Sequence, residues 1–248
     1  MKRTWRKTLL AVVMLAIVGP TFATDRLVPH TAVYRIKISI ASGTLTTSVA
    51  EDGEGFRVHS VIEPKGWAGL FVHGTIEENS HFVATEEGIL LMRYWSNDEL
   101  SSHPKAMDFV FDHNAGVVSG TVNDERYSYP LDADVHDRVS IQYELMHNLM
   151  TGTPGTDYQL LDDDEMKQLK VSSIGRKKVK VPYGTFDAVG IRHQSENSKR
   201  VTTLWCAEEL GYLPVLIEQS RNGEVKGRAV LAEYHAGMPG ESAVSAAK

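Results

Sequence analysis

The sequence contains almost no cysteine: Cys206 is the only one among its 248 residues. A single cysteine excludes an internal disulfide, so a packed core must hold the fold together even in an oxidising compartment. An inert, buried thiol is the expected state of Cys206. A nucleophilic role would need an activating base, for which His193 is the nearest histidine in the sequence.

Local signatures of catalysis and metal binding are also absent. No Gly-x-Ser-x-Gly motif or phosphate-binding glycine loop occurs, and none of the ten histidines forms a His-x-His or His-x-x-x-His unit. The acidic run at 162–165 lacks the spacing of a calcium loop, so we interpret it as a solvated turn. We predict no catalytic residue, metal ligand or cofactor, although catalytic groups on separate strands would leave no spacing to detect.

Basic residues are outnumbered by acidic ones, with 26 Lys and Arg against 32 Asp and Glu and a formal net charge of −6. Four of the basic residues fall within the first 23 positions. A chain that begins at Thr24 therefore carries 22 basic and 32 acidic residues, a net charge of −10. Such a surface repels a phosphate backbone, so we expect no nucleic-acid partner.

The N-terminal segment has the parts of a secretory leader: basic residues, an apolar run over 9–18, and small residues at Thr21 and Ala23. We predict a leader over 1–23 that is cleaved before Thr24, with an uncleaved anchor as the alternative. No later apolar run approaches the ~20 residues of a membrane-spanning helix. The expected product is a periplasmic protein, peripheral to the membrane at most.

Alternation of apolar and polar residues is the dominant pattern after the leader, and it predicts strands with one buried and one solvent-exposed face. It begins with Tyr34, Ile36, Ile38 and Ile40. Similar runs predict strands at 56–62, 70–76, 89–95, 107–112, 117–122, 158–161, 169–174, 177–181, 185–193, 200–206, 212–219 and 226–234. Short turns between them, including one at Gly175, indicate an antiparallel meander. We predict one β-rich domain over 24–235 and a flexible tail over 236–248.

One segment has helical spacing instead. Apolar residues recur from Val135 to Met150, Asp134 can cap the start, and Gly152 can end the helix. We predict a helix over about 134–151. Its apolar stripe is wide enough to contact a sheet on more than one side, so we place it on the concave face of a curved, open half-barrel.

Two aromatic residues beside glycines, Trp67 and Phe71, and Trp95 at the end of a later predicted strand could line an apolar pocket, and they are its candidate ligand-binding residues. The same three side chains would also suit a sheet core. Asp137 and Arg138, at the start of the predicted helix, form a candidate polar cluster facing a cavity. Helix capping and a structural ion pair are the alternative for these two residues.

Several motifs together resemble the exported proteobacterial family called "domain of unknown function 3108". They are LDADVHDRVS at 131–140, VPYGTFD at 181–187, TLWCA at 203–207 and GYLPV at 211–215. The resemblance implies a periplasmic, mainly antiparallel β protein without an assigned reaction, and it adds Trp205 to the candidate ligand-binding residues. Cys206 departs from the aromatic or aliphatic residue expected after the tryptophan. The implied architecture is similar to the half-barrel carriers that move lipoproteins through the periplasm.

Three functions remain open from the sequence. The leading hypothesis is a non-enzymatic module that binds a lipid, an acyl chain or a lipoprotein segment between the sheet and the helix. The second is an envelope protein that docks another protein through strand edges or its acidic surface. The third is a hydrolase of envelope polymers that uses Asp or Glu with a His from separate strands.

Overall fold

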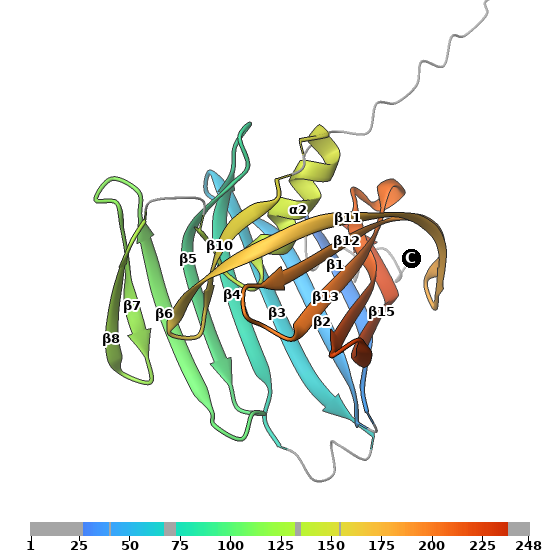
Figure 1. Ribbon diagram of the computed structural model, residues 1–248, viewed down its shortest axis with the longest axis horizontal. Coiled ribbons are helices and arrows are strands. Elements are labelled where there is room, and N and C mark those ends of the chain that lie inside the picture. The colour runs from blue at the N-terminus through green and yellow to red at the C-terminus, as the bar shows by residue number, and fades with distance from the viewer. Residues whose placement is uncertain (1–26, 40, 67–72, 132–134, 154, 238–248) are drawn as a thin grey trace, which may run out of the picture.

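The computed structural model describes residues 27–39, 41–66, 73–131, 135–153 and 155–237 (Figure 1). The predicted leader, the candidates Trp67 and Phe71, the predicted cap Asp134 and the tail from 238 onward lie outside the described residues. The roles predicted for them stay predictions.

The described residues form one sheet of 15 strands. Its first eight strands are β1 (His30–Ile38), β2 (Ala41–Asp52), β3 (Gly55–Lys65), β4 (Ile76–Ala84), β5 (Ile89–Asp98), β6 (Lys105–Asp112), β7 (Val117–Val122) and β8 (Glu125–Pro130). The other seven are β9 (Val135–His136), β10 (Asp157–Asp162), β11 (Glu165–Val181), β12 (Gly184–Ser195), β13 (Arg200–Ala207), β14 (Leu213–Arg221) and β15 (Glu224–Ala236). A short 3-10 helix, η1 (Glu208–Leu210), links β13 to β14.

Two meanders join at the centre of this sheet. The strand order runs from β8 down to β1, then β15 down to β9. The join is the antiparallel pairing of β1 with β15, from His30 opposite Ala236 to Ile38 opposite Gly227. All other neighbours are antiparallel too, except the short parallel pair β9–β10. The predicted curved, open antiparallel sheet is confirmed.

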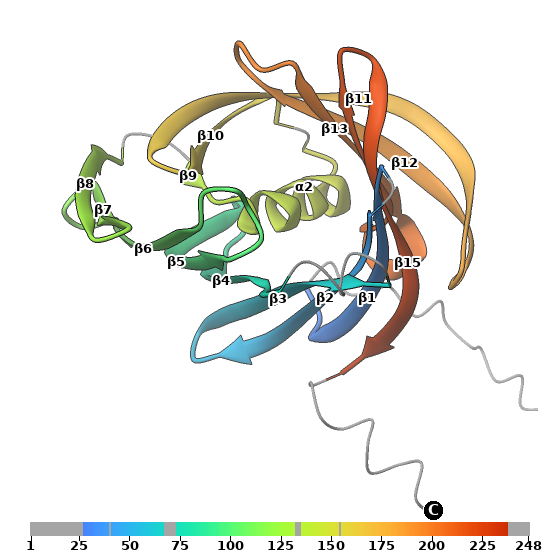
Figure 2. The same cartoon turned by 90° about the horizontal axis from the view of Figure 1, so that it is seen from below.

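The sheet curls until its two ends face each other. Figure 2 shows β1 to β6 below α2 and the long strands β10 to β13 arching above it. Side chains bridge the ends: the hydroxyl of Tyr129 on β8 donates to the backbone carbonyl of Asp164, and Lys105 Nζ lies 2.8 Å from Asp163 Oδ2. β-bulges along the sheet, for example between Val33 and Tyr34, supply local twist for this curvature.

The α-helix, α2 (Ser140–Thr151), begins six residues later than predicted. Val135 and His136, assigned to the helix from their spacing, pair with β10 as the edge strand β9. The cap at Asp137 fixes the later start, as described below. The predicted end is confirmed, because Gly152 adopts the left-handed conformation with φ of 71°.

The helix lies on the concave side of the sheet and is buried on two sides, as its wide stripe indicated. Tyr143 and Met146 pack into the main core, where the Tyr143 ring lies 5.4 Å from that of Phe82 on β4. Ile141 and Leu145 pack into a second cluster with strands β10 to β14. Among the described residues, no helix is long and apolar enough to cross a membrane.

Three strand predictions are corrected by the structure. The runs 169–174 and 177–181 are one strand, β11, because Gly175 with φ of 90° forms an irregularity in the pairing between Ser173 and Arg176 rather than a chain reversal. The run at 70–76 is not a strand over 73–75, and β4 begins at Ile76. Strands β2 and β8, and β4 over 77–84, were not predicted. The Ser, Thr and Tyr residues of β2 and β8 show little apolar alternation, and three successive polar residues, Glu77, Glu78 and Asn79, interrupt it in β4.

The pairing of β1 with β15 leads to a prediction about stability. Leu231 on β15 is fully buried opposite Tyr34 on β1, so Leu231→Ala removes core packing where the two meanders meet. We expect it to lower the free energy of unfolding by about 2 to 5 kcal/mol, measured by urea denaturation. Val225→Ala, on the same strand but 52% exposed, is the control and should change stability by less than about 0.5 kcal/mol. Equal effects of the two substitutions would contradict the central role of this packing.

Candidate functional site

The first turn of α2 is fixed by Asp137. Its Oδ1 accepts hydrogen bonds from the backbone N–H groups of Val139 (2.6 Å) and Ser140 (2.7 Å), and the Ser140 hydroxyl accepts from the N–H of Asp137 (2.9 Å). The hydroxyl of Ser80 on β4 donates to the other carboxylate oxygen at 2.6 Å. Because one side chain caps the helix and reaches the sheet, it ties the helix start to β4.

Two buried titratable groups lie side by side at this point. Burial raises the pKa of Asp137 to about 6, although hydrogen bonds from Ser80, Ser140 and Val139 oppose the shift. Burial also lowers the pKa of His136 to about 4, so its imidazole is neutral at pH 7. Its ring nitrogens find no hydrogen-bond partner among the described residues. The environment of the helix start therefore favours the neutral form of both groups.

Arg138 links the same turn to two strands. Its guanidinium lies 3.0 Å from the Glu78 carboxylate on β4 and donates to the hydroxyl oxygen of Tyr94 on β5 at 3.1 Å. The Tyr94 hydroxyl in turn donates to Glu78 at 2.6 Å. Burial disfavours the charge of Arg138, but Tyr94 and Glu78 outweigh it and raise its pKa. This network holds a permanent cation at the edge of the space between helix and sheet.

Two polar residues further along α2 complete its attachment. The Glu144 carboxylate accepts a hydrogen bond from the backbone N–H of Ile89, at the start of β5, at 2.7 Å. The Asn148 amide donates to Glu144 at 2.8 Å and to the hydroxyl oxygen of Tyr158, on β10, at 2.7 Å. These bonds tie one helix to both halves of the sheet. Sequence reasoning missed them because it considered only the apolar stripe of the helix.

A pocket of about 800 Å³ lies between α2 and the concave face of the sheet. Its volume is within the range of small-molecule sites. Both halves of the sheet and the helix contribute apolar walls, which include Leu45, Ile62, Leu145, Leu160, Leu204 and Ile217. Of these, Leu45, Ile62 and Ile217 are only half-buried, so apolar surface remains accessible inside the fold.

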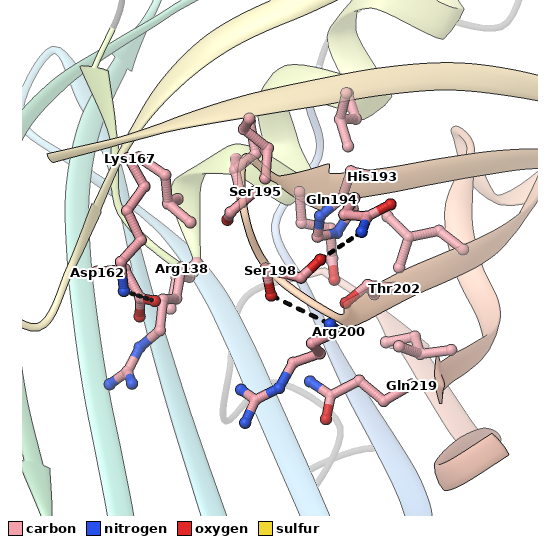
Figure 3. A pocket seen from close by; sticks show the side chains of 18 of the residues that line it. Arg138, Asp162, Lys167, His193, Gln194, Ser195, Ser198, Arg200, Thr202 and Gln219 are labelled. Atoms are coloured by element: carbon pink, nitrogen blue, oxygen red, sulfur yellow. Dashed lines mark hydrogen bonds and ion pairs between the residues drawn. The ribbon is translucent and has the colours of Figure 1, made fainter. Parts of the chain in front are cut away.

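The mouth of the pocket is charged. On one side stand Arg138 and the β10–β11 hairpin, where Lys167 pairs with Asp162 at 2.8 Å. On the other side stand the β12–β13 hairpin and β14, with His193 and Arg200 among their side chains. Figure 3 shows the two groups on opposite sides of the pocket. Burial lowers the pKa of His193 to about 4, so this ring is neutral at pH 7.

The structure separates the candidate residues predicted from the sequence. Arg138 lines the pocket, and Asp137 sits beside it in the helix cap without lining the pocket. Trp95 is half-buried and follows Tyr94, whose side chain points to the helix, so Trp95 points to the opposite face of β5. Trp205 is buried away from the lining, with Lys177 Nζ 3.7 Å above its ring. Ligand roles for the two tryptophans stay predictions.

The residues considered for nucleophilic or calcium chemistry, Cys206 and most of the acidic run at 162–165, are buried or engaged in ion pairs. Cys206 is buried, and burial raises the pKa of its thiol to about 12, which fits the expected inert state. Carboxylates of the acidic run contact cations, Asp162 with Lys167 and Asp163 with Lys105. Among the described residues, no group of three His, Cys, Asp or Glu side chains is placed to hold a metal ion.

These features define a class of protein: an open, coiled antiparallel sheet that encloses one helix and a pocket. Residues 31–230 match the family described as protein of unknown function, DUF3108, and the chain belongs to that family. The resemblance seen in the sequence motifs is thereby confirmed. A search of curated proteins found no match.

Two solved structures are similar to this chain. One is a β-barrel-like protein of the domain of unknown function DUF1849 from Brucella abortus, with a TM-score of 0.56 and 10% identity over 86% of this chain and 99% of that chain. The other is a protein from Bacteroides fragilis, described as exported and with a YmcC-like fold, with a TM-score of 0.35 and 12% identity over 83% of this chain and 94% of that chain. At 10% identity, the Brucella likeness shows the fold alone.

The buried carboxyl group of Asp137 leads to a prediction about how the stability of the fold depends on pH. The pKa of Asp137 is about 6 in the fold, against 3.8 for an aspartate in the unfolded chain, so the folded chain binds more protons at this site between those pH values. Its contribution to stability is therefore greatest below pH 3.8 and is lost as the pH rises through 6. Asp137→Asn keeps the cap acceptor, and the Ser80 hydroxyl can accept from the new amide.

We expect the free energy of unfolding of Asp137→Asn, relative to the wild type, to rise by up to about 3 kcal/mol between pH 4 and pH 7. Urea denaturation at four pH values measures this difference. The lowered pKa values of His136 and His193 act in the opposite direction, but they are common to both chains. Asp124→Asn, in an exposed turn, is the matched control. A difference that is flat or falls with pH would disprove the burial effect.

Proposed function

We propose that this protein is a periplasmic binding protein that holds an apolar or amphipathic molecule of the cell envelope, such as a lipid, an acyl chain or a lipoprotein segment. The observation that carries the proposal is the pocket between α2 and the sheet. The periplasmic location is supported by the leader pattern at 1–23.

The walls of the pocket support an apolar occupant. Half-buried Leu45, Ile62 and Ile217 line it from three different strands, β2, β3 and β14. Covering apolar surface contributes about 25 cal/mol for each Å² removed from water, so an acyl chain is a favourable occupant. The charged mouth would keep a polar end in contact with water.

The geometry supports binding better than hydrolysis. Each of the five carboxylates in the pocket lining lies 2.8 to 3.9 Å from a basic nitrogen; they are Glu78, Asp162, Asp163, Glu165 and Glu196. The carboxyl group with a raised pKa, Asp137, does not line the pocket, and both of its oxygens accept hydrogen bonds. None of these groups is poised to exchange a proton with a substrate in the pocket.

Native mass spectrometry tests the proposal. The full chain should be exported with its own leader, purified without detergent, and measured before and after solvent extraction. We expect an added mass that disappears on extraction and is identified in the extract as a lipid or acyl compound. A bare protein mass, together with no binding of added oleate or monoolein, would refute the proposal and direct attention to protein partners.

Filling the pocket should weaken binding. Ile217→Trp adds a large side chain to the β14 wall, and Leu45→Trp does the same from β2. We expect each to lower the occupancy of the bound compound at least fivefold. Val110→Trp, on β6 at a position 48% exposed, is the control and should bind as the wild type does. Thermal unfolding confirms that each variant is folded. Full occupancy in both folded pocket variants would place the ligand elsewhere.

A further inference from the structure

One side of the pocket mouth carries cations that form no ion pair with another described residue. Lys199, Arg200 and Arg221 all line the pocket and are exposed. Among the described residues, no carboxylate forms an ion pair with any of the three. Nearby carboxylates are engaged elsewhere. Glu196 lies near Lys170, at 3.9 Å, and Glu218 pairs with Arg228 at 2.6 Å. Glu224, which is opposite Arg221 in the β14–β15 pair, forms its ion pair with Lys226 at 2.5 Å.

The strand register brings two of these cations together. Arg200 at the start of β13 is directly opposite Arg221 at the end of β14. Directly opposite side chains in an antiparallel pair have Cβ atoms about 4.5 to 5.5 Å apart, and like charges in such positions destabilise the sheet. The two guanidinium groups therefore repel each other across the strands, and an anion between them would relieve that repulsion.

Polarity changes in steps along the same two strands. Because side chains two residues apart share one face of a strand, three successive cross-strand pairs face the pocket. They are a cationic pair, a neutral polar pair and an apolar pair: Arg200 with Arg221, Thr202 with Gln219, and Leu204 with Ile217. We call these six residues the amphipathic ladder. Figure 3 shows Arg200, Thr202 and Gln219 of the ladder at the pocket.

On the opposite side of the mouth, the described cations of the pocket lining are paired with carboxylates. There Arg138 binds Glu78, and Lys167 binds Asp162. The positive potential is therefore concentrated on the ladder side. The first and third pairs of the ladder are four residues apart, which is about 13 Å along the strands. A lipid molecule is long enough to place its head at the charged pair and its acyl chain at the apolar pair.

We propose that the amphipathic ladder binds the head of an anionic amphiphile, with a carboxylate or phosphate between Arg200 and Arg221 and the acyl chain running toward Leu204 and Ile217. Arg guanidinium groups bind both oxyanions through paired hydrogen bonds. This inference rests on the proposed binding function and specifies its ligand class. An uncharged lipid would fill the apolar pair without engaging the arginines.

Three probes with the same acyl chain test the ladder. Oleate carries a carboxylate, 1-oleoyl lysophosphatidate carries a phosphate, and monoolein carries no charge. The affinity of the protein for the uncharged dye N-phenyl-1-naphthylamine is measured first, and displacement of the dye by each probe then gives the dissociation constant of that probe. The proteins are the wild type, the double variant Arg200→Gln/Arg221→Gln, and the control Arg192→Gln, whose arginine is exposed on β12 outside the pocket lining.

We expect the double variant to bind at least one of the two anionic probes about tenfold more weakly than the wild type, and monoolein equally well. Arg192→Gln should leave all three dissociation constants unchanged. The relative affinities of oleate and lysophosphatidate for the wild type decide between a carboxylate and a phosphate head. Raising the salt concentration should weaken the anionic probes only.

Other outcomes separate the two proposals. If the wild type binds oleate and monoolein but the double variant loses nothing, the ladder inference is wrong and the binding function stands. If no probe displaces the dye and none binds directly, both fail. Relief of the repulsion between the arginines should leave the ligand-free double variant at least as thermally stable as the wild type. A clear loss of stability would instead assign Arg200 and Arg221 a structural role and overturn the inference.

Discussion

The chain must connect the two opposite ends of its own sheet within a few residues. β8 ends at Pro130 and β9 begins at Val135, and these two strands are the outermost strands of the 15. Five residue steps span at most roughly 18 Å, so the ends of the sheet have to lie within that distance. The sheet must therefore curl almost into a ring. The pairing of β1 with β15 makes the ring continuous on the other side.

A sheet curled in this way has an interior to fill, and the next segment of the chain fills part of it. α2 follows β9 directly and is tied to the sheet through Asp137, Arg138, Glu144 and Asn148. Because these bonds are polar and mostly buried, the helix has one position rather than a set of equivalent ones. Its apolar side chains pack on two sides, and the space they leave, about 800 Å³, is the pocket.

The sequence predicts elements whose signals are local, and it fails where a long-range contact decides the structure. Alternation located most strands and the curved, open sheet, but β2 was missed because Ser and Thr fill its alternating positions. The helix start was placed too early, since the spacing of Val135 suits a helix although its backbone pairs with β10.

The same limit applies to the site. Arg138 was a candidate because it stands beside a helix cap, which is visible in the sequence. Arg200 and Arg221 are 21 positions apart, and only the register of β13 with β14 places them opposite each other. That neither arginine forms an ion pair within the described part of the chain depends on where every nearby carboxylate points. Neither the pairing of the two arginines nor their lack of ion pairs can be read from the sequence. The change from the charged Arg200 through the polar Thr202 to the apolar Leu204 is visible there.

The position of a bound acyl chain tests most directly whether the enclosed pocket is the binding site. A crystal structure of the protein with 9,10-dibromostearate would locate the two bromine atoms by anomalous scattering. We expect the bromine peaks between α2 and the sheet, beside Leu45 and Ile217, with the carboxylate toward Arg200 and Arg221. Bromine peaks confined to the outer face of the sheet would contradict the assignment of the pocket as the binding site.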